Sequence, residues 1–239
     1  MKIKNRIYLN REISQNQLIE FDSRHSHYLS TVLRSKIGDN VSVFNESDEY
    51  LVILSSVDRK KVSGTAIEKI KLLNLNNPLT LYFSPIKKVP TEIIIQKCTE
   101  IGITNFQPII MERTQFKTFN IERLKLIAIE AIEQSNQNLI PQINIPIYFE
   151  EFIQGNNKTI LACCLTEEAD RVGQVLNSNK LNINGILIGP EGDFSDNEIN
   201  TIQNNNFIVP VSLGNNVLKS ETACIVASSL IKEYLSHAN

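Results

Sequence analysis

The sequences GILIGPEGDFSDNEI at residues 185–199 and IVPVSLGNNVLKSET at residues 208–222 decide the expected fold. Each begins as a short run rich in Ile, Val and Leu, which is typical of a strand buried on both faces. Each run ends at a glycine, Gly189 or Gly214, where the backbone can turn sharply and a ligand can approach it closely. The two stretches therefore predict two neighbouring strands, each followed by a glycine loop.

Helices are expected to begin directly after both loops. Ser195 and Glu198 have the spacing of a capping box, so a helix is expected from about Asp196. Ser220 and Glu221 begin the last helix in a similar way. Open α/β sheets bind ligands outside the carboxyl ends of their strands, so the two loops predict one shared pocket. The alternative for either loop is an ordinary connection between a strand and a helix.

The chain between the first third and these loops alternates between strand and helix patterns. Strands are expected at residues 79–84, 105–110 and 159–165, with a poor, proline-interrupted strand at 143–149. Helices are expected from a Thr91 cap to Gly102, from an Asn120 cap through residues 121–135, and over residues 167–176. This alternation predicts an α/β fold with a mostly parallel sheet that helices cover on both faces.

The first 73 residues have a different pattern. Short β-branched runs predict strands at residues 7–9, 40–45, 49–57 and 61–70. One helix that Ser23 can cap is expected to interrupt them and to end before Gly38. These elements suggest a small β-barrel, followed by a polar linker at residues 73–78. We therefore expect one domain over residues 1–73 and a second over residues 78–239.

The composition is that of an ordinary globular protein, with 42% hydrophobic and 21% charged residues among 239. No run of 18 apolar residues predicts a membrane span, and the N-terminus lacks an apolar segment of signal-peptide length, so we expect a cytoplasmic protein. The net charge of −2 argues against a generally basic nucleic-acid binder. Residues 1–73 nevertheless carry 12 Lys and Arg against 9 Asp and Glu, which weakly favours a module that guides a polyanion.

Several common catalytic and binding motifs are absent from the sequence. It has no dinucleotide-binding or P-loop glycine pattern, no H-E-x-x-H and no G-x-S-x-G. With only three histidines, a His-based nucleophile triad is not expected, and no metal site is predicted. The four cysteines have neither metal-ligand nor disulfide spacing, so we interpret them as reduced and mostly buried. Polar chemistry around the glycine loops is what remains.

Three strand ends could converge at one site with this chemistry. They are residues 165–167, 189–192 and 213–219. Tight loops there could read an adenine edge through their backbone, and Glu167 could bind a ribose hydroxyl. Glu167 could equally be a first-turn carboxylate that the helix dipole favours. In the first third, Arg34 could contact phosphates or belong to a solvated helix face. Lys97 could likewise contact phosphates or belong to a solvated helix face.

Several stretches together resemble the RsmE family of ribosomal RNA methyltransferases in the SPOUT superfamily. They are HYLSTVLR at 27–34, EIIIQKCTEIGITNFQPIIMERT at 92–114, IERLKLIAIEAIEQS at 121–135, LIGPEGDFS at 187–195 and VSLGNNVLKSETA at 211–223. The resemblance implies an N-terminal PUA-like RNA-binding barrel and a C-terminal domain with a deep trefoil knot. It also implies a homodimer that binds S-adenosylmethionine and methylates N3 of a uridine in 16S ribosomal RNA of the small subunit.

The resemblance also implies roles for individual residues. Binding of S-adenosylmethionine is expected at Leu165, Thr166, Glu167, Leu187, Gly189, Pro190, Glu191, Gly192, Leu213, Gly214, Val217, Leu218 and Thr222. Lys219 could favour the anionic uracil and Glu221 could take its proton, so both are catalytic candidates. Substrate contacts are expected from Arg34, Lys97, Arg113 and Asn216.

This chain departs from the usual family pattern at the RNA-facing positions. Asn216 and Lys219 stand where the family usually has arginine, and Asp193 replaces a glycine of the usual GPEGG. Asn136 and Gln137 replace a Gly-Arg pair. Lysine keeps the charge of arginine but loses the planar fork that pairs with phosphate or a uracil edge. Two alternatives therefore stay open. One is a catalytically weak or inactive RNA-binding or assembly protein, and the other is a SPOUT enzyme with another RNA target.

Overall fold

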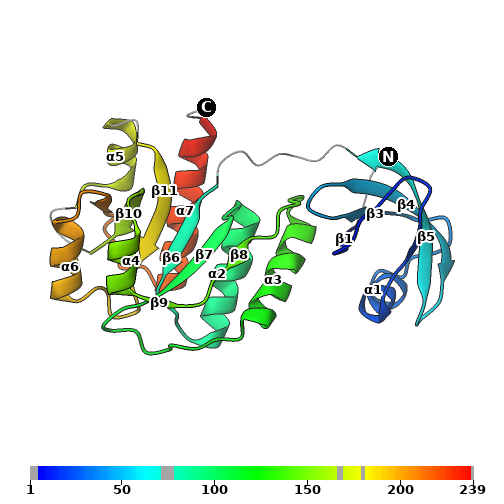
Figure 1. Cartoon of the computed structure of the whole chain (residues 1–239), viewed down its shortest axis with the longest axis horizontal. Helices are drawn as coiled ribbons and strands as arrows, with labels where there is room; N and C mark the ends of the chain where they lie inside the picture. The colour runs from blue at the N-terminus through cyan, green and yellow to red at the C-terminus, as the bar shows by residue number, and fades with distance from the viewer. Residues whose placement is uncertain (1–4, 71–77, 166–168, 179–180, 238–239) are drawn as a thin grey trace. The chain divides into compact units, whose positions relative to one another are not determined.

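The computed structural model describes residues 5–70, 78–165, 169–178 and 181–237 (Figure 1). It divides into two compact units. Unit 1 contains residues 1–74 together with 132–140, and unit 2 contains residues 75–131 together with 141–239. The expected linker at 73–78 lies outside the described residues except for Pro78.

Unit 1 is built on a curled five-stranded sheet (Figure 1). Its strands are β1 (Arg6–Tyr8), β2 (Leu18–Glu20), β3 (Asn40–Phe44), β4 (Glu49–Val57) and β5 (Val62–Ile70), in the order β1-β3-β4-β5-β2. β1 pairs with β3 in parallel, and the other pairs are antiparallel. The four predicted strands are confirmed, whereas β2 was not predicted. Alternate residues such as Val41, Val43 and Val52 fill the core of this unit.

The helix of unit 1 ends before Gly38 as predicted, but its cap differs from the prediction. α1 (Ser23–His27) has Asp22 as its cap, because the Asp22 carboxylate accepts from the His25 N–H at 2.8 Å. Ser23 is therefore the first helical residue and not the cap. The helix continues as the π-helical turn η1 (Tyr28–Val32) and ends well before Gly38.

Residues 132–140 join unit 1 through a buried arginine. Arg6 pairs with the Glu49 carboxylate at 2.9 and 3.0 Å, and both side chains are only 9% exposed. The same guanidinium donates to the carbonyls of Ile132 at 3.0 Å and Gln137 at 2.9 Å. The backbone N–H of Tyr8 donates to Glu133 at 2.8 Å. A charged group that satisfies four acceptors ties a distant segment to the sheet.

Unit 2 contains a parallel seven-stranded sheet, as the alternating pattern predicted. Its strands are β6 (Thr80–Phe83), β7 (Asn105–Ile110), β8 (Gln142–Ile143), β9 (Ile147–Tyr148), β10 (Thr159–Cys163), β11 (Ile183–Ile188) and β12 (Ile208–Val211). They are ordered β12-β10-β11-β6-β7-β8, and β9 pairs with the end of β7. β12, β10 and β11 are therefore neighbours, so their carboxyl ends lie at one edge of the sheet.

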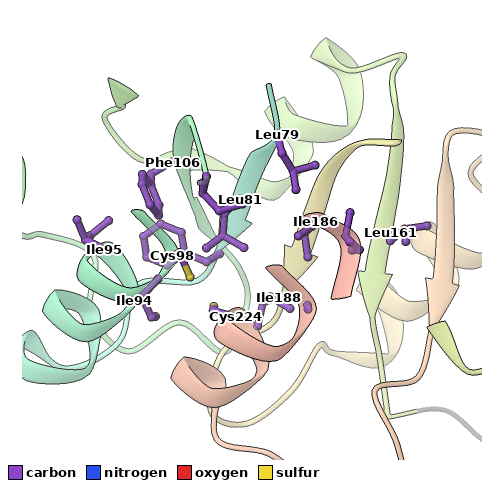
Figure 2. Close-up of a cluster of buried hydrophobic side chains, with 14 of the residues drawn as sticks. Leu79, Leu81, Ile94, Ile95, Cys98, Phe106, Leu161, Ile186, Ile188 and Cys224 are labelled. Atoms are coloured by element: carbon purple, nitrogen blue, oxygen red, sulfur yellow. The ribbon is translucent and has the colours of Figure 1, made fainter. Parts of the chain in front are cut away.

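Helices cover both faces of this sheet. They are α2 (Lys88–Ile101), α3 (Ile121–Gln134), α4 (Phe149–Gly155), α5 (Val172–Ser178), α6 (Asp196–Gln203) and α7 (Ser220–His237). α2, α3, α5 and α7 contribute to one hydrophobic cluster, which includes Leu81, Ile186 and Cys224 (Figure 2). α4 and α6 contribute Phe152 and Ile202 to a second cluster with alternate residues of the same strands.

Two helix predictions in unit 2 need correction, and one helix was not predicted. α2 begins at Lys88, so Thr91 is not its cap; the Thr91 hydroxyl donates to the Ile86 carbonyl at 3.0 Å instead. Pro90 is tolerated in the first turn, where a missing N–H removes no helical bond. α5 begins at Val172, later than predicted, and α4 was not predicted. Gly102 ends α2 with φ of 101° and α6 begins at Asp196, as predicted.

Side chains along the strands alternate between the two clusters. Leu161 lies in the cluster under α2 and α7, whereas Cys164 lies in the cluster under α4 and α6. In β11, Ile188 belongs to the first cluster and Leu187 to the second. No helix of the described residues is both long and apolar enough to span a membrane. The trefoil knot stays a prediction.

Candidate active site

A cavity of about 460 Å³ opens at the carboxyl ends of β10, β11 and β12 in unit 2. The loops that follow these strands and the beginnings of α2 and α7 enclose it. Its lining is Lys87, Pro90, Cys163, Cys164, Leu165, Ile188, Gly189, Pro190, Glu191, Asp193, Leu213, Gly214, Asn216, Val217, Leu218, Lys219, Ser220, Glu221 and Ala223. The convergence of the three strand ends is confirmed.

The loop after β11, which we call the first glycine loop (residues 189–195), is a tight turn. The Asp193 N–H donates to the Pro190 carbonyl at 2.9 Å, and Asp193 has a left-handed φ of 59°. A Cβ atom on Gly189 would lie 3.1 to 3.3 Å from ring carbons of Phe194, closer than most side chains tolerate. Ser195 and Glu198 form the predicted capping box and lead the chain into α6. Glycine at position 189 thus lets Phe194 fold back under the loop.

The loop after β12, the second glycine loop (residues 212–219), is held by polar contacts. Gly214 has φ of 137°, a conformation that favours glycine. The Ser212 hydroxyl accepts from the Gly214 N–H at 3.3 Å, and Arg171 donates to the Asn215 side chain at 2.6 Å. Ser220, at the start of α7, donates to the Gly189 carbonyl at 3.1 Å. This last bond joins the first glycine loop to the start of the helix that follows the second glycine loop.

The cavity combines apolar walls with a few charged side chains. Cations come from Lys87 and Lys219, and carboxylates come from Glu191, Asp193 and Glu221. A cavity of this size, with few polar groups on mainly apolar walls, is typical of a site for a small organic ligand. A cation and a carboxylate on one wall can also stabilise an anion and accept a proton.

The two cysteines on the cavity wall are not suited to nucleophilic chemistry. Burial raises the pKa of the Cys164 thiol to about 12, and burial also raises the pKa of Cys163 well above its usual range. The thiolate is the reactive form, so both side chains stay protonated at neutral pH. All four cysteines are free thiols. Within the described residues, no group of three or more His, Cys, Asp and Glu is arranged to hold a metal ion.

Most residues expected to bind the cofactor line this cavity. They are Leu165, Gly189, Pro190, Glu191, Leu213, Gly214, Val217 and Leu218, and the catalytic candidates Lys219 and Glu221 line it too. Leu187, Gly192 and Thr222 do not. Leu187 is fully buried in the cluster under α4 and α6, because strand alternation turns it away from the face of Ile188. Thr166 and Glu167 lie outside the described residues.

Of the expected substrate contacts, Asn216 alone lines the cavity. Lys97 lies on α2 and pairs with Glu100 at 2.8 Å. Arg113 donates to two backbone carbonyls of the first glycine loop. Arg34 belongs to unit 1, where it is exposed and has φ of 52°. Their contacts with RNA stay predictions.

Sequence reasoning missed several residues of the cavity wall. Lys87 and Pro90 follow the carboxyl end of β6, the neighbour of β11 in the sheet. The rule that indicated the two glycine loops would also have indicated this strand end, had the strand order been known. Ser220 and Ala223 line the wall because α7 begins beside the first glycine loop. That proximity has no signal in the sequence.

Comparison with known proteins identifies the family. Residues 74–232 match the RNA methyltransferase domain, and residues 21–67 match the RNA methyltransferase PUA domain. Ribosomal RNA small subunit methyltransferase E of Rickettsia conorii is 33% identical over 239 residues, covering 98% of this chain and 97% of the relative. This chain belongs to the small subunit methyltransferase E family. The methyltransferase E of Buchnera aphidicola from Acyrthosiphon pisum is 32% identical over 247 residues, covering 95% of this chain and 92% of the relative.

Solved structures support the fold. A methyltransferase of Legionella pneumophila, solved with bound S-adenosylmethionine, is 28% identical with a TM-score of 0.80. The match covers 95% of this chain and 96% of that one. Methyltransferase E of Neisseria gonorrhoeae, 23% identical, has the same fold with a TM-score of 0.83 over 96% of this chain and 97% of that one. The fold is therefore the SPOUT-type α/β fold with a PUA domain.

Proposed function

We propose that this protein transfers a methyl group from S-adenosylmethionine to N3 of a uridine in 16S ribosomal RNA of the small subunit. The observation that carries the proposal is a single cavity where both glycine loops meet beside Lys219 and Glu221. Membership of the small subunit methyltransferase E family supports the RNA class. The Legionella relative with bound S-adenosylmethionine supports the donor.

The donor fits the cavity by size and by the character of its wall. The volume of about 460 Å³ lies within the usual range for small-molecule sites. Nothing in the described part of the chain lies within 4 Å of an added Cβ atom on Gly214, so an adenosine can approach the backbone of the second glycine loop closely. We assign donor binding to Leu165 and to those predicted residues of both loops that line the cavity. Thr166 and Glu167 stay candidates for donor binding, with Glu167 as the candidate for a ribose hydroxyl.

The residues on the wall can then handle the proton at N3. When bound, S-adenosylmethionine supplies the methyl group and leaves as S-adenosylhomocysteine. Lys219 favours the anionic uracil, because a nearby cation stabilises the charge that develops when N3 loses its proton. The N3 proton goes to Glu221 or to water, and the new N–C bond forms as the sulfur–methyl bond breaks.

Recognition of the RNA rests on fewer arginines than the family usually has. Asn216 and Lys219 can each contact RNA beside the donor, but neither offers the bidentate fork of arginine. We place residues 1–73 as an RNA-binding domain and residues 78–239 as the methyltransferase domain. A cytoplasmic homodimer bound to the small subunit is the assembly that the family resemblance favours.

The test is a transfer assay that identifies the methylated atom. Purified protein is incubated with small ribosomal subunits or free 16S RNA and with S-adenosylmethionine carrying a trideuterated methyl group. Nucleosides from the digested RNA are then separated by mass spectrometry against synthetic standards. We expect labelled 3-methyluridine as the only labelled nucleoside. Labelled ribose 2′-O-methyl nucleosides or 1-methylguanosine would contradict the assignment to uridine N3.

The sequence also gives a reason to consider binding without methyl transfer as an outcome of that assay. Asn216 on the cavity wall and the Asn136-Gln137 pair remove arginines that the family usually carries. Binding of donor and RNA without transfer of the label would favour an RNA-binding or assembly protein. Calorimetry with S-adenosylmethionine and with RNA, run on the same preparation, distinguishes that outcome from a misfolded sample.

A further inference from the structure

The turn after β7 (residues 111–114) contacts the first glycine loop from outside the cavity. Nη1 of Arg113 donates to the Gly192 carbonyl at 2.8 Å and to the Phe194 carbonyl at 3.0 Å. The aliphatic stem of Arg113 passes over Gly192, where an added Cβ atom would lie 3.5 Å from Cδ. One side chain thus contacts the loop through both its stem and its charged end.

The two carbonyls lie on either side of the most strained residue of the loop. Asp193 has φ of 59°, a left-handed conformation that is unfavourable for an ordinary L-residue. Aspartate tolerates it better than most, and here its carboxylate accepts from the Phe194 N–H at 2.9 Å. The two bonds from Arg113 fix the carbonyls before and after this residue. They therefore select the turn in which Glu191 and Asp193 line the cavity.

The turn that carries Arg113 is itself fixed to the sheet. The Thr114 hydroxyl lies 2.7 Å from the Ser84 hydroxyl, in a buried position at the end of β6. The Glu112 N–H donates to Glu198 of the capping box at 2.8 Å. Glu198 also accepts from the Ser195 N–H at 2.8 Å. This turn therefore supports the loop from Gly192 to the start of α6, and such preorganisation lowers the cost of binding a ligand.

We propose that Arg113 is a positioning residue that holds the first glycine loop in its donor-binding conformation through the carbonyls of Gly192 and Phe194. The inference rests on the proposed function, because it takes the first glycine loop as part of the donor site. It replaces the expectation that Arg113 contacts RNA with a role inside the protein.

The test compares Arg113→Met with Arg113→Lys and with the matched control Arg123→Met. Arg123 is an exposed arginine on α3 whose Nε lies 3.4 Å from Glu92, a weak surface pair. Without RNA, Arg113→Met should weaken binding of S-adenosylmethionine about tenfold, which is roughly 1.4 kcal/mol. Arg113→Lys should lose less, because lysine keeps the charge and one donor. Arg123→Met should bind the donor as the wild type does.

Steady-state kinetics separates positioning from catalysis. Arg113→Met should raise the KM for the donor, while kcat at saturating donor stays within about twofold, because bound donor restores the loop. Unchanged donor affinity with a tenfold loss of RNA affinity would overturn the proposal and return Arg113 to the RNA contacts. An equal loss of donor affinity in Arg123→Met would also overturn it.

A double variant tests the conformational argument directly. Glycine adopts φ of 59° without a side-chain penalty, so Asp193→Gly should reduce the effect of Arg113→Met on donor affinity. Equal effects in both backgrounds would contradict the role of the left-handed residue.

Hydrogen exchange of the free protein tests the conformation of the first glycine loop separately from donor binding. In Arg113→Met the amide of Asp193, which is bonded to Pro190, should exchange faster even if no donor binds. Unchanged exchange there would overturn the positioning role. Failure of the wild type to bind S-adenosylmethionine would instead count against the proposed function alone.

Discussion

At the scale of single residues, the glycines of the site differ in what requires them. Gly214 has positive φ and nothing within 4 Å of an added Cβ, so glycine is required there by the backbone conformation. Gly189 has no such φ. Glycine is required there because an added Cβ atom would lie 3.1 to 3.3 Å from the ring carbons of Phe194. The turns at both glycines were predictable from the sequence. The partner of Gly189 was not, because the approach of Phe194 depends on the tertiary path of the loop.

Gly189→Val should therefore lower donor affinity by more than about tenfold, because its side chain would displace Phe194 and the loop with it. Calorimetry with S-adenosylmethionine measures the loss, and circular dichroism checks that the fold remains. Gly173→Ala is the matched control, since α5 leaves open space at that position. Unchanged affinity in Gly189→Val would show that the donor binds elsewhere.

Lys219→Ala should slow methyl transfer far more than it weakens donor binding, because its positive charge is needed when uracil loses its proton. Single-turnover transfer and calorimetry give the two quantities, with an expected rate loss of about a hundredfold. Lys219→Arg, which restores the residue usual in the family, should keep most of the rate. Equal losses in transfer and in binding would remove Lys219 from the catalytic role.

At the scale of elements, local signals predicted what local interactions determine. The capping box at Ser195 and the left-handed Gly102 mark helix ends in the structure as they do in the sequence. The cap at Thr91 was wrong because Pro90 fits inside a first helical turn, which the pattern cannot distinguish from a position before the helix. β2 is three residues long and pairs with β5, so only its partner makes it a strand.

Glu198 of the capping box of α6 also binds a backbone group outside its own helix. Glu198 is 6% exposed and accepts from the N–H groups of Ser195 and Glu112, both at 2.8 Å. Glu198→Gln places an amide donor against one of these N–H groups, so it should lower the free energy of unfolding by about 1–3 kcal/mol. Urea unfolding measures this, with the exposed Glu122→Gln as the control. A loss as small as that of the control would show that the cap adds no stability.

At the scale of the whole molecule, the division into units follows contacts rather than chain order. Residues 132–140 belong to unit 1, although the sequence pattern placed them in the second domain. The contacts responsible join Arg6 to Ile132 and Gln137, which are more than a hundred positions away. Strand order has the same non-local origin. The sequence predicted that three strand ends meet, but not that β6 adds Lys87 to the same cavity.

Arg6→Met should destabilise unit 1 by about 3–5 kcal/mol, because it leaves the buried carboxylate of Glu49 without its cation. Hydrogen exchange measures the opening of each unit separately. The double variant Arg6→Met with Glu49→Met should lose much less, since no unpaired charge remains. If the double variant loses as much as the single one, the pair is not what holds the segment.

Mass spectrometry of 16S RNA nucleosides from cells with and without this gene tests the proposed methylation. We predict 3-methyluridine at one position of the RNA, lost on deletion and restored by the wild-type protein. Lys219→Ala, expressed at the same level, should restore little of it. An identical 3-methyluridine content in both strains would contradict the central claim, and retained donor binding in vitro would then favour the non-catalytic RNA-binding protein.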